Sequence, residues 1–279
     1  MNETSIIALI LILINLLVTY QGLRSQVFFD RFKFEVDRIL IHKEYKRIVT
    51  SGFLHVGWMH FASNMYTLYA FSGSIENYLG IIPFILIYFA SLIGSSLFSL
   101  FVHRNHGDYT AVGASGAVSG IVFASIVLFP GMGIGFLFLP IHIPAWLFGL
   151  VYVVYTIYGV KSKRDNIGHE AHLGGLVIGV LIALMLQPSA IITNTFTVLA
   201  ILLPAIGFIA FVLLKPQALL IDNLYFKNHD QHLTMDHRYN QAKASKQKEI
   251  DTILDKISNK GMSSLSEKEK RALEEYSNR

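Results

Sequence analysis

The sequence has no cysteine and unusually little charge. Of its 279 residues, 15% are Asp, Glu, Lys or Arg, against about 25% in a typical soluble domain. The absence of cysteine excludes disulfides, thiolate nucleophiles and cysteine-ligated metal centres. The scarcity of charge is more informative, because a soluble protein needs a charged surface. With 53% hydrophobic residues and a mean hydropathy of +0.48, the composition is typical of a membrane protein.

The apolar residues fall in long blocks, several of which reach the roughly 20 residues that a helix needs to cross a bilayer. We predict spans near residues 4–21, 58–78, 81–102, 113–130, 137–160, 168–187 and 190–214. The first block has no basic segment before it and no small-residue cleavage site after it, so we interpret it as a span and not as a signal peptide. The fold class that follows is an all-α, multi-pass integral membrane protein, for which we expect the bacterial cell (inner) membrane.

Residues 21–55 differ from these blocks because they mix aromatic and aliphatic residues with basic ones. Such a composition predicts an amphipathic element at the membrane interface, and a small soluble insert is the alternative. The apolar members are Phe28, Phe29, Phe32, Phe34, Ile39, Leu40 and Ile41.

Residues 217–279 are polar, and we predict a flexible stretch to about residue 245 followed by a short helical hairpin. Apolar residues recur there at helical spacing, Gly261 offers a helix stop, and Ser266 with Glu269 forms a capping-box pattern. The apolar residues are Ile250, Ile253, Leu254 and Ile257. We therefore divide the chain into a core of residues 1–189, an added membrane helix at 190–216, and a tail at 217–279 whose partner is unknown.

Polar groups are costly inside a membrane, so each one there needs a reason. Three clusters lie at or near the starts of predicted spans. They are His55-Val-Gly-Trp-Met-His60-Phe-Ala-Ser-Asn64, Gly113-Ala114-Ser115-Gly116 with Gly120, and Ala171-His172-Leu173-Gly174-Gly175 with Gly179. His60 and Asn64 are four residues apart and so share one helical face.

Acyl transfer is the chemistry that would use the three clusters together. A serine hydroxyl such as that of Ser115 becomes a good nucleophile when an imidazole such as that of His172 takes its proton. The tetrahedral intermediate then needs hydrogen-bond donors for its oxyanion. His60, Asn64 and the backbone N–H groups that open the helix near Gly113 can supply them.

For Ser115 to meet His172, the predicted helices at 113–130 and 168–187 must approach closely. Gly116 and Gly120 are four residues apart on the first helix, and Gly175 and Gly179 are four apart on the second. Small residues at that spacing allow two backbones to pack tightly in lipid. The packing pattern therefore falls on the two helices that the chemistry requires to touch.

Each cluster alone has a simpler interpretation. The glycine-serine run is common as a packing face, and His60 with Asn64 suits an interhelical hydrogen-bonded pair. His172 alone suits an interfacial or proton-relay histidine. The combination of the three is much more specific than any one of them.

The three clusters, in this order, resemble the rhomboid family of intramembrane serine proteases. The family pattern is a His with an Asn four residues later, then Gly-x-Ser-Gly, then Ala-His-x-x-Gly. The resemblance covers roughly residues 4–187 and extends to His55 and Glu76, expected as packing residues. It implies a six-helix core, to which this chain adds a seventh helix and the polar tail.

The resemblance also implies roles for individual residues. Ser115 would be the nucleophile and His172 the general base of a dyad without an acidic third member. Asn64, His60 and the backbone from Gly113 to Ser115 would bind the oxyanion and substrate. The implied substrates are single-spanning membrane proteins with a locally unstable helix, and no metal or cofactor is needed.

Two positions depart from the family pattern. The Trp-Arg pair of the first loop is Lys46-Arg47 here, and the position four residues after the nucleophile, often an aromatic that supports the histidine ring, is Ser119. The sequence therefore leaves open which side chain supports His172.

Other functions fit less well. A catalytically inactive rhomboid-like protein that binds client helices is the main alternative, although such proteins typically lose the serine or the histidine. A transporter would predict inverted repeats, and the sequence shows no convincing internal symmetry. A zinc protease would need His-Glu-x-x-His, and His169-Glu170-Ala171-His172 has the wrong spacing. Asp108 is isolated, which disfavours an aspartyl protease. The tail histidines His229, His232 and His237 are interpreted as solvated, and no basic face indicates nucleic acid.

The orientation in the membrane stays open. All 23 Lys and Arg residues lie in the first, third and fifth loops and the tail, which seven spans place on one side. The positive-inside rule makes that side cytoplasmic. Ser115 opens toward the same side, whereas in most rhomboids it faces away from the cytoplasm.

Overall fold

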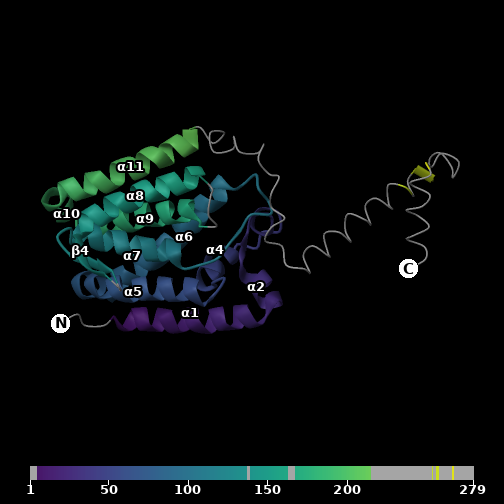
Figure 1. The fold of residues 1–279 in the computed structure, drawn as a ribbon, viewed down its shortest axis with the longest axis horizontal. Helices are drawn as coiled ribbons and strands as arrows, with labels where there is room; N and C mark the ends of the chain where they lie inside the picture. The colour runs from purple at the N-terminus through teal and green to yellow at the C-terminus, as the bar shows by residue number, and fades with distance from the viewer. Residues whose placement is uncertain are drawn as a thin grey trace. The chain divides into compact units, whose positions relative to one another are not determined.

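The computed structural model describes residues 5–136, 139–162, 167–214, 253, 256, 257 and 266. The chain divides into two compact units, Met1–Leu219 and Leu220–Arg279. The first unit is a bundle of long helices (Figure 1). In the second, Ile253, Lys256 and Ile257 are helical, Ile253 is buried and Ser266 is exposed. The other residues of the predicted hairpin, including Gly261 and Glu269, lie outside the described residues.

The long helices confirm the prediction of an all-helical membrane bundle. Their bounds are α1 Ile6–Arg24, α5 Trp58–Leu79, α6 Ile81–Val102, α7 Ser115–Leu128, α8 Ala145–Ser162, α9 His169–Leu186 and α11 Thr195–Leu214, which follows the short α10 Ser189–Thr193. Within the described residues, α1, α6, α8, α9 and α11 are long and apolar enough to cross a membrane. α7 is apolar but shorter.

α7 lies at the centre of the bundle, between α5 and α9 (Figure 1). Every residue from Gly116 to Leu128 is buried, as expected of a helix that is apolar all round. Its 14 residues span only about 21 Å, less than the hydrocarbon core of about 30 Å. If α7 lies across the membrane, irregular backbone must cover part of the depth, which a bilayer tolerates only where protein surrounds that backbone.

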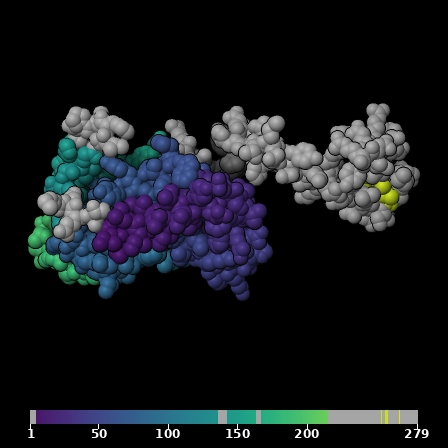
Figure 2. Space-filling view, turned by 90° about the horizontal axis from the view of Figure 1, so that it is seen from below, coloured from purple at the N-terminus to yellow at the C-terminus, as the bar shows by residue number. Residues whose placement is uncertain are grey.

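α1 lies at the edge of the bundle, beside α5, and crosses the face seen in Figure 2. Its buried residues include Ala8, Leu11 and Asn15, whereas Ile6, Leu13 and Leu17 are more than half exposed. One side of this helix thus packs on the bundle, and the other presents aliphatic side chains to lipid.

The predicted span at 137–160 begins too early. α8 begins at Ala145, and the preceding residues form an antiparallel hairpin of β3 Gly133–Phe136 and β4 Leu139–Pro144. Glycines at 133 and 135 weaken a helix, and Pro144 is better placed directly before a helix than inside one. The apolar run was long enough for either structure, so hydropathy alone could not separate them.

The predicted span at 190–214 is interrupted at Asn194, between α10 and α11. The Asn194 side-chain amide donates to the carbonyls of Val127 (2.9 Å) and Leu128 (3.3 Å). These are carbonyls at the C-terminus of α7, which have no partner within their own helix. The interruption therefore caps the central helix.

Residues 26–53 form several short elements instead of one amphipathic segment. These are α2 Gln26–Phe32, β1 Phe34–Glu35, α3 Val36–Leu40, α4 Arg47–Thr50 and the 3-10 helix η1 Ser51–Phe53. β1 pairs antiparallel with β2 Thr110–Ala111. Phe34 and Ile39, expected at the lipid headgroups, are buried in the protein, because Leu100 and Tyr109 offer apolar partners.

Arg47 holds this region together from inside. It is 3% exposed, and its Nη1 donates to the carbonyls of Asp30 (2.7 Å) and Lys33 (2.8 Å). Its Nε forms an ion pair with Glu44 at 2.6 Å, and this contact lowers the pKa of Glu44. The arginine of the family's Trp-Arg pair is thus a structural centre of the first loop.

Candidate active site

Ser115 is the first residue of α7 and is partly exposed. The helix has no side-chain cap, because its N-cap residue is Ala114. The first N–H groups of a helix have no partner within it and carry the positive end of its dipole. The Ser115 hydroxyl therefore lies beside backbone donors that can bind an anion.

Gly113 shapes the turn before the nucleophile. Its φ of +132° belongs to a region that favours glycine, and its N–H donates to the Ser51 carbonyl at 3.0 Å. A Cβ at this position would lie 2.8 Å from His60 Cε1, 2.9 Å from His60 Nε2 and 3.9 Å from Ser115 Oγ. The His60 ring and the Ser115 hydroxyl thus both lie close to Gly113.

α7 and α9 are in backbone contact through their glycines. A Cβ on Gly175 would overlap the Gly116 carbonyl, and one on Gly179 would overlap the Gly120 carbonyl. A Cβ on Gly116 would lie 3.5 Å from the Ala171 carbonyl and would overlap Ser95 of α6. Since Ser115 precedes Gly116 and His172 follows Ala171, the contact brings the two predicted catalytic segments together.

His172 is half-buried in the first turn of α9, where its N–H donates to the Gly168 carbonyl at 3.1 Å. Its Nδ1 lies 3.1 Å from the hydroxyl of Tyr152 on α8. The Tyr152 and His172 rings are 6.3 Å apart at an interplanar angle of 28°. The sequence interpretation missed Tyr152. The one sequence feature that could have indicated Tyr152 is its hydroxyl inside an apolar span, because a buried tyrosine hydroxyl needs a hydrogen-bond partner.

Asn64 is buried on α5, and its amide nitrogen donates to the His60 carbonyl at 2.9 Å. A primary amide has two N–H donors, so one hydrogen serves the helix and the other can serve a ligand. Asn64 and His60 share one helical face, as their spacing predicts, and that face meets the Gly113 turn through His60.

His55 lies behind His60, with the two rings 4.9 Å apart and nearly perpendicular. It is fully buried before α5 begins, and its Nδ1 lies 2.8 Å from the Thr19 hydroxyl. Burial, aided by the nearby His60, lowers the pKa of His55 to about 3. His55 is therefore neutral at physiological pH and supports the His60 ring.

Glu76 lies at the other end of α5 from His60. Its carboxylate accepts a hydrogen bond from the Ser5 hydroxyl, which in turn caps α1 by accepting from the Ala8 N–H at 2.9 Å. Glu76 therefore ties the start of α1 to the end of α5, and it lies far from Ser115.

A second polar cluster surrounds Glu170, two residues before His172. Its carboxylate accepts from Tyr109 (2.7 Å) and Ser99 (2.9 Å) and lies 3.3 Å from His103 Nε2. His103 stacks on Tyr109 at 3.5 Å. Burial, with the negative Glu170 beside it, raises the pKa of Tyr109 well above its usual value. The cluster anchors the first turn of α9 to α6 and to the loop before α7.

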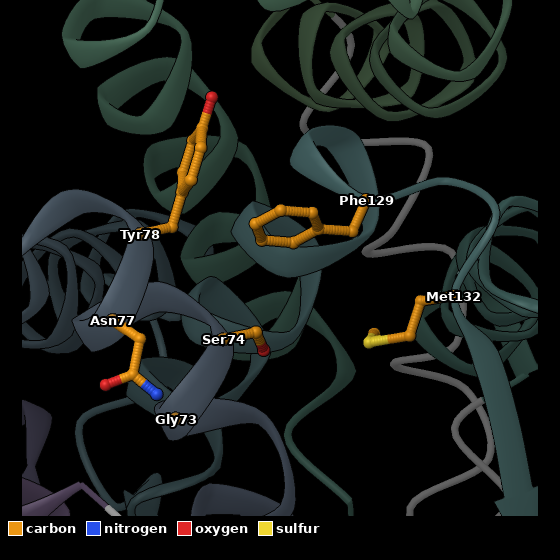
Figure 3. Close-up of a pocket in the computed structure, with 6 residues that line it drawn as sticks. All are labelled: Gly73, Ser74, Asn77, Tyr78, Phe129 and Met132. Atoms are coloured by element: carbon orange, nitrogen blue, oxygen red, sulfur yellow. The ribbon is translucent and has the colours of Figure 1, made fainter. Parts of the chain in front are cut away.

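A cavity of about 620 Å³ lies at the opposite ends of α5 and α7 (Figure 3). Ser74 and Tyr78 come from α5, whereas Phe129 and Met132 follow α7, and the Tyr78 and Phe129 rings meet at 5.1 Å. Because both helices begin beside Ser115 and His60, this cavity is separate from the candidate active site. Across the described residues, no three His, Asp or Glu side chains gather as metal ligands.

Comparison with known proteins agrees with this geometry. A family model described as the rhomboid domain matches residues 42–189, and one described as a family of unknown function (DUF6576) matches residues 233–279. "Rhomboid protein 1, mitochondrial" of Saccharomyces cerevisiae is 33% identical over 150 residues, covering 51% of this chain and 43% of that protein.

Two further relatives give the same result. "RHOMBOID-like protein 12, mitochondrial" of Arabidopsis thaliana is 31% identical over 149 residues, covering 48% of this chain and 44% of the relative. "Presenilin-associated rhomboid-like protein, mitochondrial" of Homo sapiens is 30% identical over 139 residues, covering 48% of this chain and 36% of the relative. The chain thus spans less than half the length of each. All three names place the relatives in mitochondria, which gives no support to the predicted bacterial inner membrane.

The rhomboid domain match covers more than half of the chain and includes His60, Ser115 and His172. The chain is a multi-pass integral membrane protein, and it belongs to the rhomboid family.

Proposed function

We propose that this protein is an intramembrane serine endopeptidase that cleaves membrane-spanning protein substrates through Ser115 and His172. The observation that carries the proposal is the backbone contact of α7 with α9, which brings the segments bearing these two residues together. A client-binding protein without activity has no need of a serine at a helix start in a segment that packs against one bearing a supported histidine.

In the proposed reaction, His172 takes the proton of the Ser115 hydroxyl as Ser115 Oγ attacks the scissile carbonyl. The developing oxyanion accepts hydrogen bonds from the Ser115 N–H, from His60 and from the second amide hydrogen of Asn64. His172 then gives its proton to the leaving amine, and a water molecule, activated in the same way, hydrolyses the acyl-enzyme. Each group acts as proposed without a metal or cofactor.

The test is cleavage of a single-spanning model substrate by the purified protein in lipid vesicles. We expect Ser115→Ala and His172→Ala each to lower kcat/KM by roughly 10³-fold or more, since both groups act in the same transition state. Ser63→Ala, on the exposed side of α5, is the matched serine control and should keep full activity.

A serine-reactive probe gives an independent measurement, because it needs no knowledge of the natural substrate. Labelling of the wild type that is lost in Ser115→Ala supports the proposal. Failure of the folded wild type both to react with the probe and to cleave several substrates would instead favour the client-binding function. The compartment, whether a bacterial inner membrane or a mitochondrial one as in the named relatives, is a separate question for fractionation.

A further inference from the structure

The support of His172 comes from an unexpected helix. Ser119, four residues after the nucleophile, is 6% exposed and too small to support an imidazole. The aromatic beside His172 is Tyr152 of α8, with its hydroxyl 3.1 Å from Nδ1 and its ring at 28° to the imidazole. A centroid separation of 6.3 Å lies within the range of offset aromatic pairs, about 4.5–7 Å.

Tyr152 is itself held on several sides. Its ring lies 5.5 Å from that of Phe123 on α7 and 5.9 Å from that of Phe148 on its own helix. The ring is thus wedged between α7 and α9, so its hydroxyl is presented to His172 in a fixed position.

The hydroxyl of Tyr152 can donate or accept, so its hydrogen bond with His172 has two possible directions. When the tyrosine oxygen accepts, Nδ1 carries the proton. Nε2 then has the lone pair that a general base needs. With the opposite direction, Nε2 would be protonated and unable to accept the proton of Ser115.

We infer that Tyr152 is a positioning residue that holds His172 as the Nδ1-protonated tautomer, in place of an aromatic on the nucleophile's own helix. This inference rests on the proposed protease function, because only that tautomer of His172 can take the proton of Ser115. In a triad this orientation comes from a carboxylate, whereas here a phenol oxygen supplies it without a buried charge.

The direct test is ¹⁵N NMR of His172 in the full-length protein, assigned by comparison with His172→Asn. The wild type should show a protonated Nδ1 and an unprotonated Nε2 at pH 8. In Tyr152→Phe, which keeps the ring but loses the hydroxyl, the signals should shift toward a mixture of tautomers. Tyr158→Phe on the exposed side of α8 is the matched control and should leave the spectrum unchanged.

Activity provides the second readout. We expect Tyr152→Phe to lower kcat on the order of 10²-fold with little change in KM, less than the 10⁴-fold loss seen when a triad carboxylate is neutralised. Tyr152→Ala should lose more activity. The double variant Ser119→Tyr/Tyr152→Ala should have a kcat at least about tenfold higher than Tyr152→Ala alone. The reason is that a tyrosine at residue 119 can enter the vacated space beside His172.

The outcomes separate this inference from the proposed function. An Nε2-protonated wild type, or a Tyr152→Phe variant with unchanged kcat and tautomer, would overturn the inference even if Ser115 cleaves substrate. Conversely, a wild type that neither cleaves nor reacts with a serine probe overturns the proposed function, whatever the NMR spectrum shows. Rescue by the relocated tyrosine would support a positioning role over a purely structural one.

Discussion

At Gly113, one residue meets two separate constraints. Its φ of +132° disfavours any side chain, and a Cβ would lie 2.8 Å from the His60 ring. We expect Gly113→Ala to cost about 1–3 kcal/mol of stability through backbone strain. It should also lower the rate of cleavage at least about tenfold. The His60 ring would have to move away from the added methyl group, and so from the position in which it is proposed to bind the oxyanion.

The control for this substitution is Gly57→Ala. Gly57 lies just before α5 near the same histidines, but a Cβ there would have no atom within 4 Å, and its extended φ of −179° suits any residue. Melting temperature and cleavage rate would be measured for both variants. Equal behaviour of the two would contradict the importance of the Gly113 turn.

His55 makes stability depend on pH. Its folded pKa of about 3 lies below the usual 6.5, so between these values the unfolded chain binds a proton that the folded chain does not. Stability is therefore complete above about pH 6.5 and is lost as the pH falls toward 3. Between pH 8 and pH 5 the expected loss from this residue is about 2 kcal/mol.

The measurement is chemical unfolding in detergent micelles at both pH values. His55→Gln keeps a polar side chain that does not titrate, so the difference between wild type and variant isolates this histidine from the others. A variant that loses as much stability on acidification as the wild type would show that His55 is not the cause.

At the residue scale, sequence reasoning named Ser115, His172, His60 and Asn64 as candidate site residues but did not name Tyr152 or Glu170 as their neighbours. The first four form local motifs whose spacing is visible in the chain. Tyr152 and Glu170 depend on contacts between α8 and α9, or α6 and α9, that no local pattern records. Glu170 was noticed only as part of a failed zinc motif, although a buried carboxylate always needs partners.

At the scale of the element, the contact of α7 with α9 depends on glycines that face a neighbouring backbone. We expect Gly175→Val to destabilise the protein by more than about 3 kcal/mol or to prevent its folding, because its side chain would overlap the Gly116 carbonyl. The same contact positions Ser115 relative to His172, so any folded variant should also lose cleavage.

Gly207→Val provides the matched control within a membrane helix. A Cβ on Gly207 of α11 would have no atom within 4 Å, so its effect on stability should stay within about 0.5 kcal/mol. Unfolding in detergent would be compared for the two variants. A small effect at Gly175 would mean that the two helices can separate without loss of stability.

Elements were predicted well where length and hydropathy together define a helix, and poorly where they do not. The bounds of α5 and α6 match the predicted spans within one or two residues. The hairpin before α8 was missed because an apolar run of that length fits a hairpin as well as a helix. The first loop was expected as one interfacial segment, and its short elements were missed. The pairing of its β1 strand with β2 joins residues far apart in the chain, and hydropathy does not reveal such a pairing.

At the scale of the whole molecule, the absence of cysteine makes topology measurable with introduced cysteines. Lys43 and Gly131 are both exposed and lie on loops at opposite ends of the bundle. We expect Lys43→Cys and Gly131→Cys to react with an impermeant maleimide from opposite sides of sealed vesicles. Seven crossings also predict that Ser245→Cys in the tail reacts from the same side as Lys43→Cys.

Unmodified protein is the control, because it has no thiol to label. Labelling of Lys43→Cys and Gly131→Cys from one side would contradict the bundle topology, and labelling of Ser245→Cys with Gly131→Cys would mean an even number of crossings. In oriented membranes the same variants decide between the charge distribution, which places Lys43 in the cytoplasm, and the usual rhomboid orientation, which does not.

The contact between α7 and α9 also bears on how the protein is made. Ser115 opens α7, but the histidine expected to activate it arrives two helices later, at the start of α9. A nascent chain on the ribosome thus inserts its serine well before the helix that completes the pair. Until the glycines of α9 settle against α7, the emerging chain has a hydroxyl and no base. If Ser115 and His172 act as proposed, the chain therefore has no assembled catalytic pair while its first helices are inserted.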